Sequence, residues 1–297
     1  MIRKQNQLDC RQCHSSFPAE EGIADFCRDS YYDTFPGAAC LSCEDCQGLA
    51  NEYVGTASRV VDFYLPAALS RSKNGRPLRL LDSGCGNGIS VDLLGEAGIE
   101  AWGNDVSALR KWQWQERKFR RRLVVADTRR LPFPDGSFDL VISSGVLEHV
   151  GVEEGRNPGY FVRPRADRDA QRLDFLRELV RVLAPGGQLY LDFPNGAFPI
   201  DFWHGDRPGG ARFHGLGEGF LPKTGEIRRY LEHFGAFKVE PLSPLHRLRM
   251  KQVGAHWYGR LFELPMKILL RLMELPVLAF AAGSGLNPYL VLKVSHR

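Results

Sequence analysis

Short apolar runs alternate with amphipathic segments along most of this 297-residue chain. The apolar runs are rich in valine, leucine and isoleucine and are bounded by glycine, proline or aspartate, a pattern that predicts strands. Seven strands are predicted, at 78–84, 99–105, 123–127, 138–145, 187–194, 237–242 and 288–295. Because helical segments separate the early strands, we expect an α/β fold with a mostly parallel sheet and helices on both faces.

Helical periodicity is clearest in two segments. Thr56 is expected to cap a helix that extends to Arg71 and places Val60, Val61 and Tyr64 near helical spacing. Residues 172–184 form a second helix with one apolar stripe, which the following Pro-Gly-Gly sequence ends.

Long segments between the later strands predict where a substrate binds. Insertions are expected at about 151–170, 194–223 and 243–287. Loops of such length are usually functional or mobile, and ligands of open α/β sheets bind at the carboxyl ends of the strands. The predicted organisation is a cysteine-rich module over 1–50 and a catalytic domain over 51–297.

Composition and charge narrow the function only slightly. A hydrophobic content of 43% and a net charge of +4 are those of an ordinary globular protein, and the charge does not by itself indicate a polyanion partner. The first residues, MIRKQNQLDC, contain no apolar run after the basic ones, so we expect no secretory signal and a cytoplasmic location. The basic, aromatic stretch 110–122 suits nucleic acid or a solvated helix face, and the low net charge favours the helix face.

A glycine loop follows the first predicted strand of the sheet. LLDSGCGNGIS, from Leu80 to Ser90, places Gly84, Gly86 and Gly88 where the backbone turns tightly and passes close to a ligand. The spacing differs from a dinucleotide fingerprint, because the position of its third glycine holds Ile89. Asp105, at the end of the second strand, is suitably placed to accept hydrogen bonds from ribose hydroxyls.

Four ordered motifs resemble class I methyltransferases that use S-adenosylmethionine, of the methyltransferase type 11-like branch. They are the glycine loop, GNDVS ending near Asp105, VVADTRRLPFPDGSFDLVISSGVLEHV and RVLAPGGQLYLD. The resemblance covers roughly 55–240 and the last strand. It implies a Rossmann-like, seven-stranded methyltransferase sheet, with a small N-terminal module added.

The resemblance also implies a cofactor site. Asp82 and the loop Ser83, Gly84, Cys85, Gly86, Asn87 and Gly88 would hold the methionine part of S-adenosylmethionine. Asp105 and Val106 would lie at the ribose, and Asp127 with Thr128 at the adenine edge. Ser143, with Ser144, would line the path to the methyl group. Local structural roles are the alternatives for Asp82 and Asp127, as a strand-end hydrogen bond and a helix cap.

Two histidines are the predicted catalytic residues. His149, in VLEHV after the fourth strand, titrates near neutral pH and can serve as a general base, or it can simply support the turn. His204 lies in an insertion that also holds Asp201 and His214. The interpretation favoured for that insertion is an aromatic lid, with its phenylalanine and tryptophan side chains over the cofactor and its histidines solvated.

The segment 260–275 has a broad apolar face that includes Leu261, Leu264, Ile268 and Leu272. Such a face packs on the domain, which is the default expectation, or lies in a membrane interface. The uncharged segment 275–292 is interrupted by proline and glycine, so we expect no transmembrane helix there.

The cysteines cluster near the N-terminus, where Cys-x-x-Cys pairs in a reducing compartment suggest a metal site. Cys10 and Cys13 supply one pair, and the other is either Cys40 with Cys43 or Cys43 with Cys46. Many glycan and natural-product methyltransferases begin with a similar pattern that ends in Cys-Gly-Leu, which CEDCQGL matches with one inserted residue. This resemblance favours structural Zn²⁺ on Cys10, Cys13, Cys43 and Cys46. An iron–sulfur cluster or unligated thiols are the alternatives.

The resulting hypothesis is a methyltransferase that acts on a small-molecule, sugar or lipid-linked acceptor, with possible peripheral membrane contact through 260–275. The alternatives are an RNA methyltransferase with a zinc module and a non-catalytic cofactor- or partner-binding module. The sequence leaves the acceptor atom and the oligomeric state open.

Overall fold

A computed structural model describes residues 2–4, 6–10, 14–27, 30–33, 35, 37–72, 76–155, 159–205, 211–248 and 257–296. The chain divides into two compact units. The first unit comprises Met1–Ile142 and Arg181–Ala184, and the second comprises Ser143–Val180 and Pro185–Arg297.

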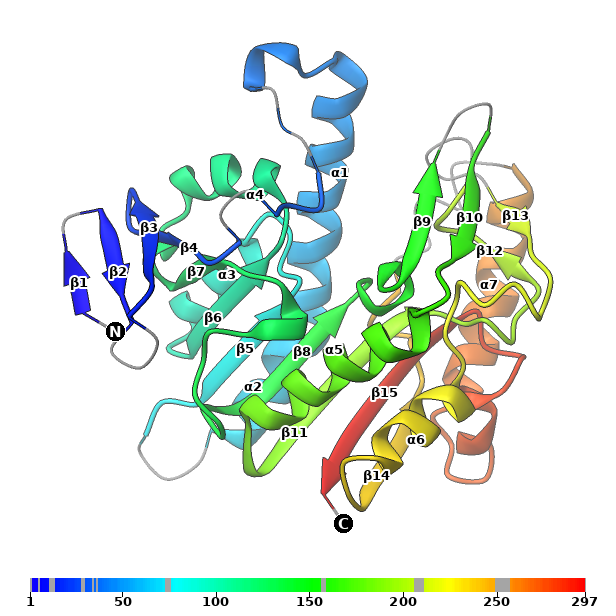
Figure 1. The fold of residues 1–297 in the computed structure, drawn as a ribbon. Helices are drawn as coiled ribbons and strands as arrows, with labels where there is room; N and C mark the ends of the chain where they lie inside the picture. Colours follow the sequence, from blue (N-terminus) through cyan, green and yellow to red (C-terminus); the bar gives the residue numbers. More distant parts are fainter. Residues whose placement is uncertain are drawn as a thin grey trace. The chain divides into compact units, whose positions relative to one another are not determined.

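The first unit is built on a sheet whose strands follow the order β1-β2-β3-β4-β7-β6-β5-β8 (Figure 1). Its predicted strands are confirmed as β5 (Arg79–Ser83), β6 (Glu100–Asp105), β7 (Leu123–Val125) and β8 (Phe138–Ser144), of which β8 continues into the second unit. The pairs β5–β6, β5–β8 and β6–β7 are parallel. This is the predicted Rossmann-like arrangement, and side chains such as Leu80, Leu81 and Leu140 are completely buried in it.

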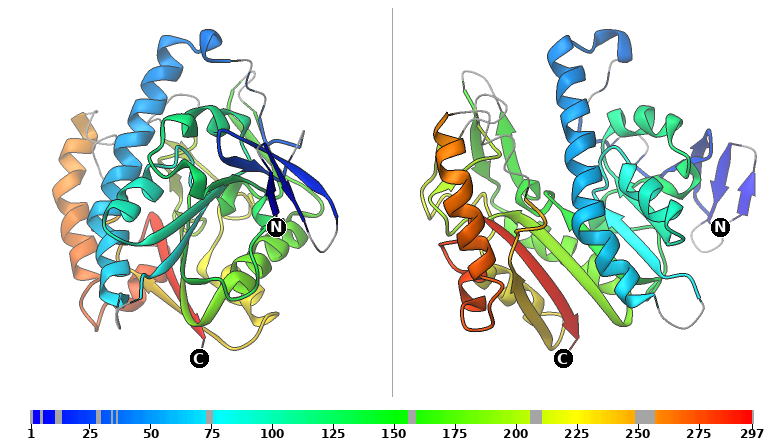
Figure 2. Two further views of the ribbon diagram at one scale, coloured as in Figure 1. Left: turned by 90° about the vertical axis from the view of Figure 1, so that its left-hand side faces the viewer. Right: turned by 180° about the vertical axis from the view of Figure 1, so that it is seen from behind.

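Helices and short turns connect these strands. They are α1 (Cys43–Arg59), the π-helical turn η2 (Val60–Tyr64), α2 (Leu65–Arg71), α3 (Ile89–Glu96), α4 (Ala108–Gln113) and the 3₁₀ turns η1 (Ala38–Cys40), η3 (Trp114–Glu116), η4 (Arg120–Arg122) and η5 (Thr128–Arg130). Figure 2 shows α1 and α2 joined through η2 into one long helical rod. The basic stretch predicted to be helical is therefore a short helix followed by 3₁₀ turns.

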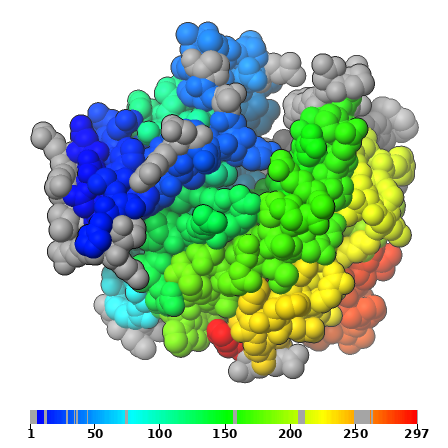
Figure 3. Space-filling model, in the orientation of Figure 1, coloured from blue at the N-terminus to red at the C-terminus, as the bar shows by residue number. Residues whose placement is uncertain are grey.

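The N-terminal segment extends this sheet. Its strands are β1 (Ile2–Lys4), β2 (Gln7–Asp9), β3 (Ser16–Glu20) and β4 (Ile23–Asp25). The first four strands are antiparallel neighbours, and β4 pairs in parallel with β7 through Ala24–Val124 and Asp25–Val125. The segment forms a continuous surface with the rest of the first unit (Figure 3). The prediction of a seven-stranded sheet with a separate module therefore left out these added strands.

The first long helix begins earlier than predicted. Ser42 caps α1, since its hydroxyl accepts a hydrogen bond from the amide of Asp45, 3.1 Å away, while the Asp45 carboxylate accepts from the Ser42 amide at 2.9 Å. This reciprocal capping box fixes the start at Cys43, so the predicted start at Thr56 is wrong. The predicted module boundary at residue 50 falls inside the same helix.

The second unit contains a three-stranded layer in the order β11-β15-β14. The three strands are β11 (Leu183–Pro194), β15 (Tyr289–His296) and β14 (Phe237–Leu242), and β15 is antiparallel to both neighbours. All three had been predicted, although β11 begins a few residues earlier than expected. Helices α5 (Arg168–Val182), α6 (Thr224–Glu232) and α7 (Trp257–Leu272) accompany them, together with the 3₁₀ turn η8 (Ala279–Gly283).

The predicted insertions contain regular structure. The first holds the antiparallel pair β9 (Val152–Gly155) and β10 (Phe161–Pro164), and the second holds β12 (Ile200–Asp201) and β13 (Arg212–Phe213). The 3₁₀ turn η6 (Leu147–His149) precedes β9. The third insertion holds α7 and η8. Across the described residues, no helix is long and apolar enough to cross a membrane.

Packing of α7 differs from the default expectation. The side chains that it buries are Leu270 and, just after its end, Met273. Leu261, Leu264, Ile268 and Leu272 are all exposed, with 65% of Leu261 and 67% of Leu264 accessible to solvent. The predicted apolar face is thus an exposed stripe, because a different face of the helix contacts the unit.

Candidate functional site

The glycine loop joins β5 to α3 in the first unit. Gly84, Gly86 and Gly88 all have positive φ, at 81°, 54° and 76°, which non-glycine residues rarely adopt. A Cβ on Gly88 would lie 2.9 Å from a methyl carbon of Leu123, so this position also lacks space for a larger residue. The Asn87 side chain accepts a hydrogen bond from the Ile89 amide at 3.0 Å and thereby supports the start of α3. The loop therefore has a fixed, glycine-dependent path.

Carboxylates follow or end three adjacent strands beside this loop. Asp82 is on β5 and is buried, and its side chain accepts a hydrogen bond from the hydroxyl of Ser90. Asp105 ends β6 and accepts three backbone N–H groups, from Gly86 at 3.0 Å, Val106 at 2.8 Å and Ser107 at 3.1 Å. Burial raises the pKa of Asp105, although Arg110 and these hydrogen bonds act in the opposite direction. Asp105 thus links the strand end directly to the glycine loop.

The third strand end has a different arrangement. Asp127 caps the turn Thr128–Arg130 and forms an ion pair with Arg129, whose guanidinium approaches to 2.6 Å. The structural alternative considered for Asp127, a cap, is therefore present. Thr128 is buried, and its hydroxyl contacts that of Ser83 at 2.8 Å and the Asn104 side-chain amide at 3.1 Å. These bonds connect the ends of β5, β6 and β7.

Residues distant in sequence, which the motifs did not indicate, also contact this region. Glu52 on α1 accepts a hydrogen bond from Arg110 at 3.0 Å and one from Asn87 at 3.3 Å. Asp33 accepts from the Ser107 hydroxyl and the Ala108 amide, both at 2.6 Å. Glu52 and Asp33 belong to no sequence motif, so these contacts could not be predicted from the sequence. A cavity of ≈ 490 Å³ borders α1 and shares only Asn87 with the predicted cofactor residues.

The residues of this region fit a bound S-adenosylmethionine. Gly84, Gly86 and Gly88 have positive φ and give the loop the tight turn that is expected beside a ligand. A Cβ on Gly86 would lie 2.7 Å from the Glu52 carboxylate, so packing within the unit also requires glycine there. Carboxylate acceptors for amino and hydroxyl groups lie on the two strands joined to that loop. Cys85, inside the loop, is buried, and burial raises the pKa of its thiol well above the usual value, which makes it a poor nucleophile.

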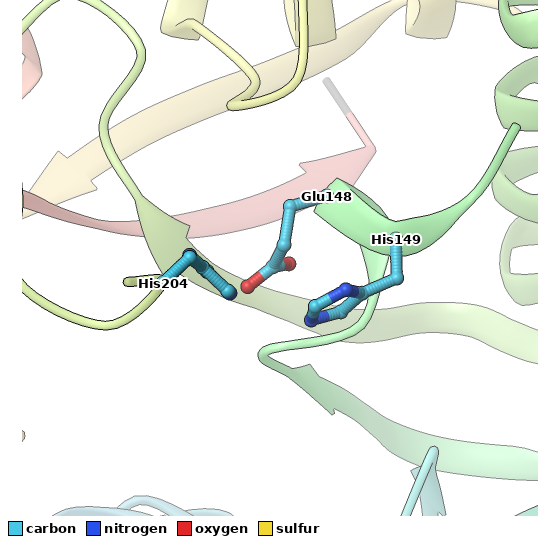
Figure 4. Close-up of side chains that lie close together, drawn as sticks. All are labelled: Glu148, His149 and His204. Atoms are coloured by element: carbon cyan, nitrogen blue, oxygen red, sulfur yellow. The ribbon is translucent and has the colours of Figure 1, made fainter. Parts of the chain in front are cut away.

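A second polar cluster lies entirely in the second unit and contains both predicted catalytic histidines. The ligand-type atoms of Glu148, His149 and His204 all lie within 4.8 Å of one another (Figure 4). Nδ1 of His149 is 2.5 Å from a carboxylate oxygen of Glu154, whose other oxygen accepts from the Tyr160 hydroxyl at 2.8 Å. The structure thus unites two histidines that are far apart in the sequence.

Asp201 orients the second histidine of the cluster. Its side chain is completely buried, and its carboxylate lies 3.0 Å from Nδ1 of His204. Arg212 donates to the same carboxylate at 3.3 Å and forms a closer pair with Glu218, at 2.6 and 2.9 Å. His204 is therefore not solvated as the lid interpretation supposed. His214 lies apart from these contacts, with its Nδ1 3.4 Å from the Gly215 carbonyl oxygen.

In this cluster, burial and the neighbouring charges shift the pKa values in opposite directions. Burial raises the pKa of Glu148, against the effect of the two histidines. Burial lowers the pKa of His149, but its hydrogen bond with Glu154 and the neighbouring carboxylates raise it above the ordinary value overall. Burial raises the pKa of Glu154, yet its hydrogen bonds to His149 and Tyr160 bring it below the usual range. His149 is thus held close to a negatively charged carboxylate.

A completely buried arginine supports this cluster from α5. The guanidinium of Arg172 donates to the carbonyl oxygens of Glu148 at 3.1 Å, Val150 at 3.2 Å and Phe220 at 2.5 Å. It also lies 3.5 Å from the Glu226 carboxylate. Arg172 therefore ties the turn that carries Glu148 and His149 to the segment that carries Phe220.

The predicted serines after β8 have different surroundings. Ser143 is buried, and its hydroxyl has no hydrogen-bond partner among the described residues. Ser144 instead donates to Asp192 at 3.0 Å, within a buried group that includes Arg247 and Tyr289. Of the two, only Ser143 has a hydroxyl left for a ligand.

The predicted zinc ligands are not brought together within the described part of the chain. Cys10 lies just after β2, and the exposed Cys43 and Cys46 lie one turn apart at the start of α1. Cys13 lies outside the described residues. Glu148, His149 and His204 are the one set of three metal-type side chains that the described residues place within ligand distance. The four-cysteine site therefore stays a prediction.

The chain also resembles known proteins. Residues 81–191 match a family described as a methyltransferase domain. The norajmaline N-methyltransferase of Rauvolfia serpentina is 27% identical over 178 residues, which cover 57% of this chain and 51% of that protein. The demethylmenaquinone methyltransferase of Thermus thermophilus is 35% identical over 135 residues, which cover 42% of this chain and 52% of that protein. The chain thus spans about half the length of these two relatives.

A solved structure completes the comparison. The phosphoethanolamine N-methyltransferase 2 of Haemonchus contortus, in complex with S-adenosyl-L-methionine, aligns with a TM-score of 0.43 at 18% identity. The alignment covers 82% of this chain and 57% of that chain. Residues 81–191 are thus similar to a methyltransferase domain, and this segment contains the glycine loop and the acidic strand ends described above.

Proposed function

We propose that the protein methylates a small-molecule, sugar or lipid-linked acceptor with S-adenosylmethionine. The observation that carries this proposal is the loop Gly84–Gly88, whose three glycines have positive φ and whose Gly86 amide donates to Asp105. In this proposal the loop and Asp82 bind the methionine part of the cofactor. Asp105 and Val106 bind the ribose, Asp127 and Thr128 the adenine edge.

The chemistry demands little covalent participation by the protein. S-adenosylmethionine supplies a methyl group on a sulfonium, which is already activated for attack by a nucleophile. The residues of this chain therefore mainly bind and orient the two reactants and exclude water. His149 and His204 are the proposed catalytic residues, and Nδ1 of each lies beside a carboxylate. Ser143 contributes a buried hydroxyl to the same unit.

Changing Asp105 to asparagine tests the cofactor assignment. Asparagine keeps the size of the side chain but loses the negative charge and one acceptor oxygen, so two charge-assisted hydrogen bonds to the ribose are weakened. Since such bonds contribute about 1.5–3 kcal/mol each, we expect S-adenosylmethionine to bind roughly 10- to 100-fold more weakly. Isothermal titration calorimetry measures this change.

Asp135→Asn is the matched control, because the Asp135 side chain is 83% exposed and pairs only at the surface with Arg181. It should leave cofactor affinity unchanged. The proposal would be wrong if the unaltered protein showed no saturable binding of S-adenosylmethionine at millimolar concentration, and the non-catalytic alternative would then gain support.

The RNA alternative has less support in the first unit. Basic residues of the stretch 110–122 pair with acidic side chains of this chain: Arg110 with Glu52, Lys118 with Glu96, and Arg120 with Glu21. Arg117 likewise lies 3.7 Å from Asp92. Paired charges of this kind contribute less to phosphate binding than free ones do. These contacts favour a solvated, ion-paired surface over an RNA-binding surface as the interpretation of residues 110–122.

Peripheral membrane contact is proposed for the exposed stripe of α7, because Leu261, Leu264, Ile268 and Leu272 recur at steps of three and four. The exposed Arg271, on the same helix, suits anionic headgroups. We expect the protein to sediment with vesicles of phosphatidylcholine and phosphatidylglycerol, and the double variant Leu264→Glu, Ile268→Glu to lose at least half of that binding.

The matched control for the vesicle assay is Val61→Glu, which changes another exposed apolar side chain, 51% accessible, in the first unit. It should sediment like the unaltered protein. Equal sedimentation of all three proteins, or none with any vesicle, would contradict the membrane contact while leaving the methyltransferase proposal intact.

A further inference from the structure

The cluster of Glu148, His149 and His204 has the donor set of a metal centre. Two imidazoles and one carboxylate converge from segments separated by more than fifty residues, η6 and the turn after β12. Figure 4 shows the Glu148 carboxylate directed into the space between the two rings. Three protein ligands of this kind, with positions left open, characterise catalytic sites for divalent transition metals.

Hydrogen bonds leave the same nitrogen available on both rings. Nδ1 of His149 is engaged by Glu154 at 2.5 Å, and Nδ1 of His204 by Asp201 at 3.0 Å. No hydrogen bond to Nε2 of either ring occurs among the described residues. A carboxylate on Nδ1 fixes the tautomer that presents a lone pair at Nε2, which is the usual support of metal-binding histidines.

Glu148 provides an independent indication of a ligand. Glu148 is 1% exposed, and its Oε2 atom has no hydrogen-bond partner within the described parts of the chain. A buried carboxylate oxygen without a partner is costly unless a cation or donor meets it. One carboxylate oxygen of Glu148 and one ring nitrogen of each histidine lie within 4.8 Å of one another, so one bound cation would satisfy all three groups.

The surroundings suit a rigid, partly dry site. Phe220 is completely buried, with its ring centroid 4.8 Å from that of His204 and 5.9 Å from that of His149. Tyr160 stacks on His204 at 6.3 Å while donating to Glu154. Aromatic walls of this kind restrict the rings and limit solvent access, two properties that tune metal centres.

We propose that Glu148, His149 and His204 bind one divalent transition-metal ion through a carboxylate oxygen and two Nε2 atoms. The site takes ions that accept mixed nitrogen and oxygen ligands, such as Mn²⁺ or Zn²⁺. Its open positions suit an oxygen of the acceptor, which makes a hydroxylated, metal-chelating compound the expected substrate class. Only this last assignment rests on the proposed methyltransferase function.

A titration with Mn²⁺ tests the site directly. The full chain, freed of metal with a chelator, is titrated without S-adenosylmethionine, and unbound Mn²⁺ is followed by electron paramagnetic resonance. Manganese is chosen because its preference for harder ligands separates this site from the N-terminal cysteines. We expect one saturable site per chain. Pulsed measurements should show nitrogen couplings from two imidazoles.

Variants distinguish ligation from a general effect on folding. Glu148→Gln and His204→Gln should each weaken Mn²⁺ binding at least roughly tenfold, and His204→Gln should leave one imidazole coupling. Glu154→Gln changes a residue that supports His149 and Tyr160 but is not a proposed ligand, so it should weaken binding less than the ligand variants do. His233→Ala, at an exposed histidine after α6, should bind Mn²⁺ as the unaltered protein does.

Two results would overturn the proposal: no saturable binding by the unaltered protein at millimolar Mn²⁺, or equal affinity in Glu148→Gln. Circular dichroism of each variant confirms that a loss of binding does not reflect unfolding. Because the titration contains no S-adenosylmethionine, its failure would not affect the cofactor assignment, and failure of cofactor binding would leave the metal site standing.

Discussion

Replacing Arg172 with methionine is expected to lower the free energy of unfolding by about 3–5 kcal/mol. The side chain is completely buried, and its guanidinium donates to three backbone carbonyl oxygens, of Glu148, Val150 and Phe220. Methionine fills much of the same volume but donates no hydrogen bond, so the three carbonyl oxygens lose a buried partner. Urea unfolding followed by circular dichroism measures the loss.

Arg177→Met is the matched control on the same helix. The Arg177 side chain is 57% exposed and pairs with the equally exposed Asp174, so the control should change stability by no more than about 0.5 kcal/mol. A similar effect of both substitutions would show that helix propensity or charge, and not the buried hydrogen bonds, accounts for the loss. Arg172→Met should also weaken Mn²⁺ binding, because Arg172 positions the turn that carries two of the ligands.

The second large effect is expected from Gly151→Ala, which should destabilise the protein by about 2–5 kcal/mol. Gly151 has φ 73°, where an alanine costs about 1–2 kcal/mol. In addition, a Cβ there would lie 2.5 Å from the Cα atom of Arg168, and backbone cannot move aside as a flexible side chain does. The overpacking adds about 1–3 kcal/mol to the conformational cost.

Gly186→Ala separates the two contributions. Gly186 has nearly the same φ, 74°, but a Cβ there would meet nothing within 4 Å. This control should therefore cost only about 1–2 kcal/mol. Thermal and urea unfolding of the two variants, compared side by side, give the difference that belongs to the contact with Arg168. Equal destabilisation would mean that the backbone at residue 168 shifts without penalty.

The strands and the turn at the glycine loop were the features that the sequence predicted best. Each of the seven predicted strands is a strand of the structure, since buried apolar runs between glycine and aspartate leave few other conformations. The path of Gly84–Gly88 followed from glycine spacing alone. Both features are determined by residues that are close together in the chain, so a single sequence is enough to predict them.

The start of α1 shows where local reasoning failed. Thr56 had the right residue type for a cap, but Ser42 and Asp45 together supply a reciprocal capping box, which is the stronger signal. The cysteine spacing of CEDCQGL indicates metal binding, whereas the serine before it caps the start of a helix. A metal-binding pair and a helix start can share these residues, and only the three-dimensional structure shows that a helix begins here.

The candidate sites were only partly predictable. His149 and His204 were each recognised, but their convergence with Glu148 depends on two distant turns meeting in the second unit. Their supporting carboxylates, Glu154 and Asp201, gain meaning only from that arrangement. Glu52 and Asp33 in the first unit are similar, because a lone carboxylate in a polar segment resembles many solvated ones.

The pairing of β4 with β7 has a consequence for the order of folding during synthesis. β4 is synthesised before its parallel partner β7, so this pairing can form only after Val125 has left the ribosome. Until then the N-terminal strands have only one another as neighbours, and an unpaired strand edge is open to wrong partners. Strands β1–β4 can thus join the rest of the sheet only after β7 has been made.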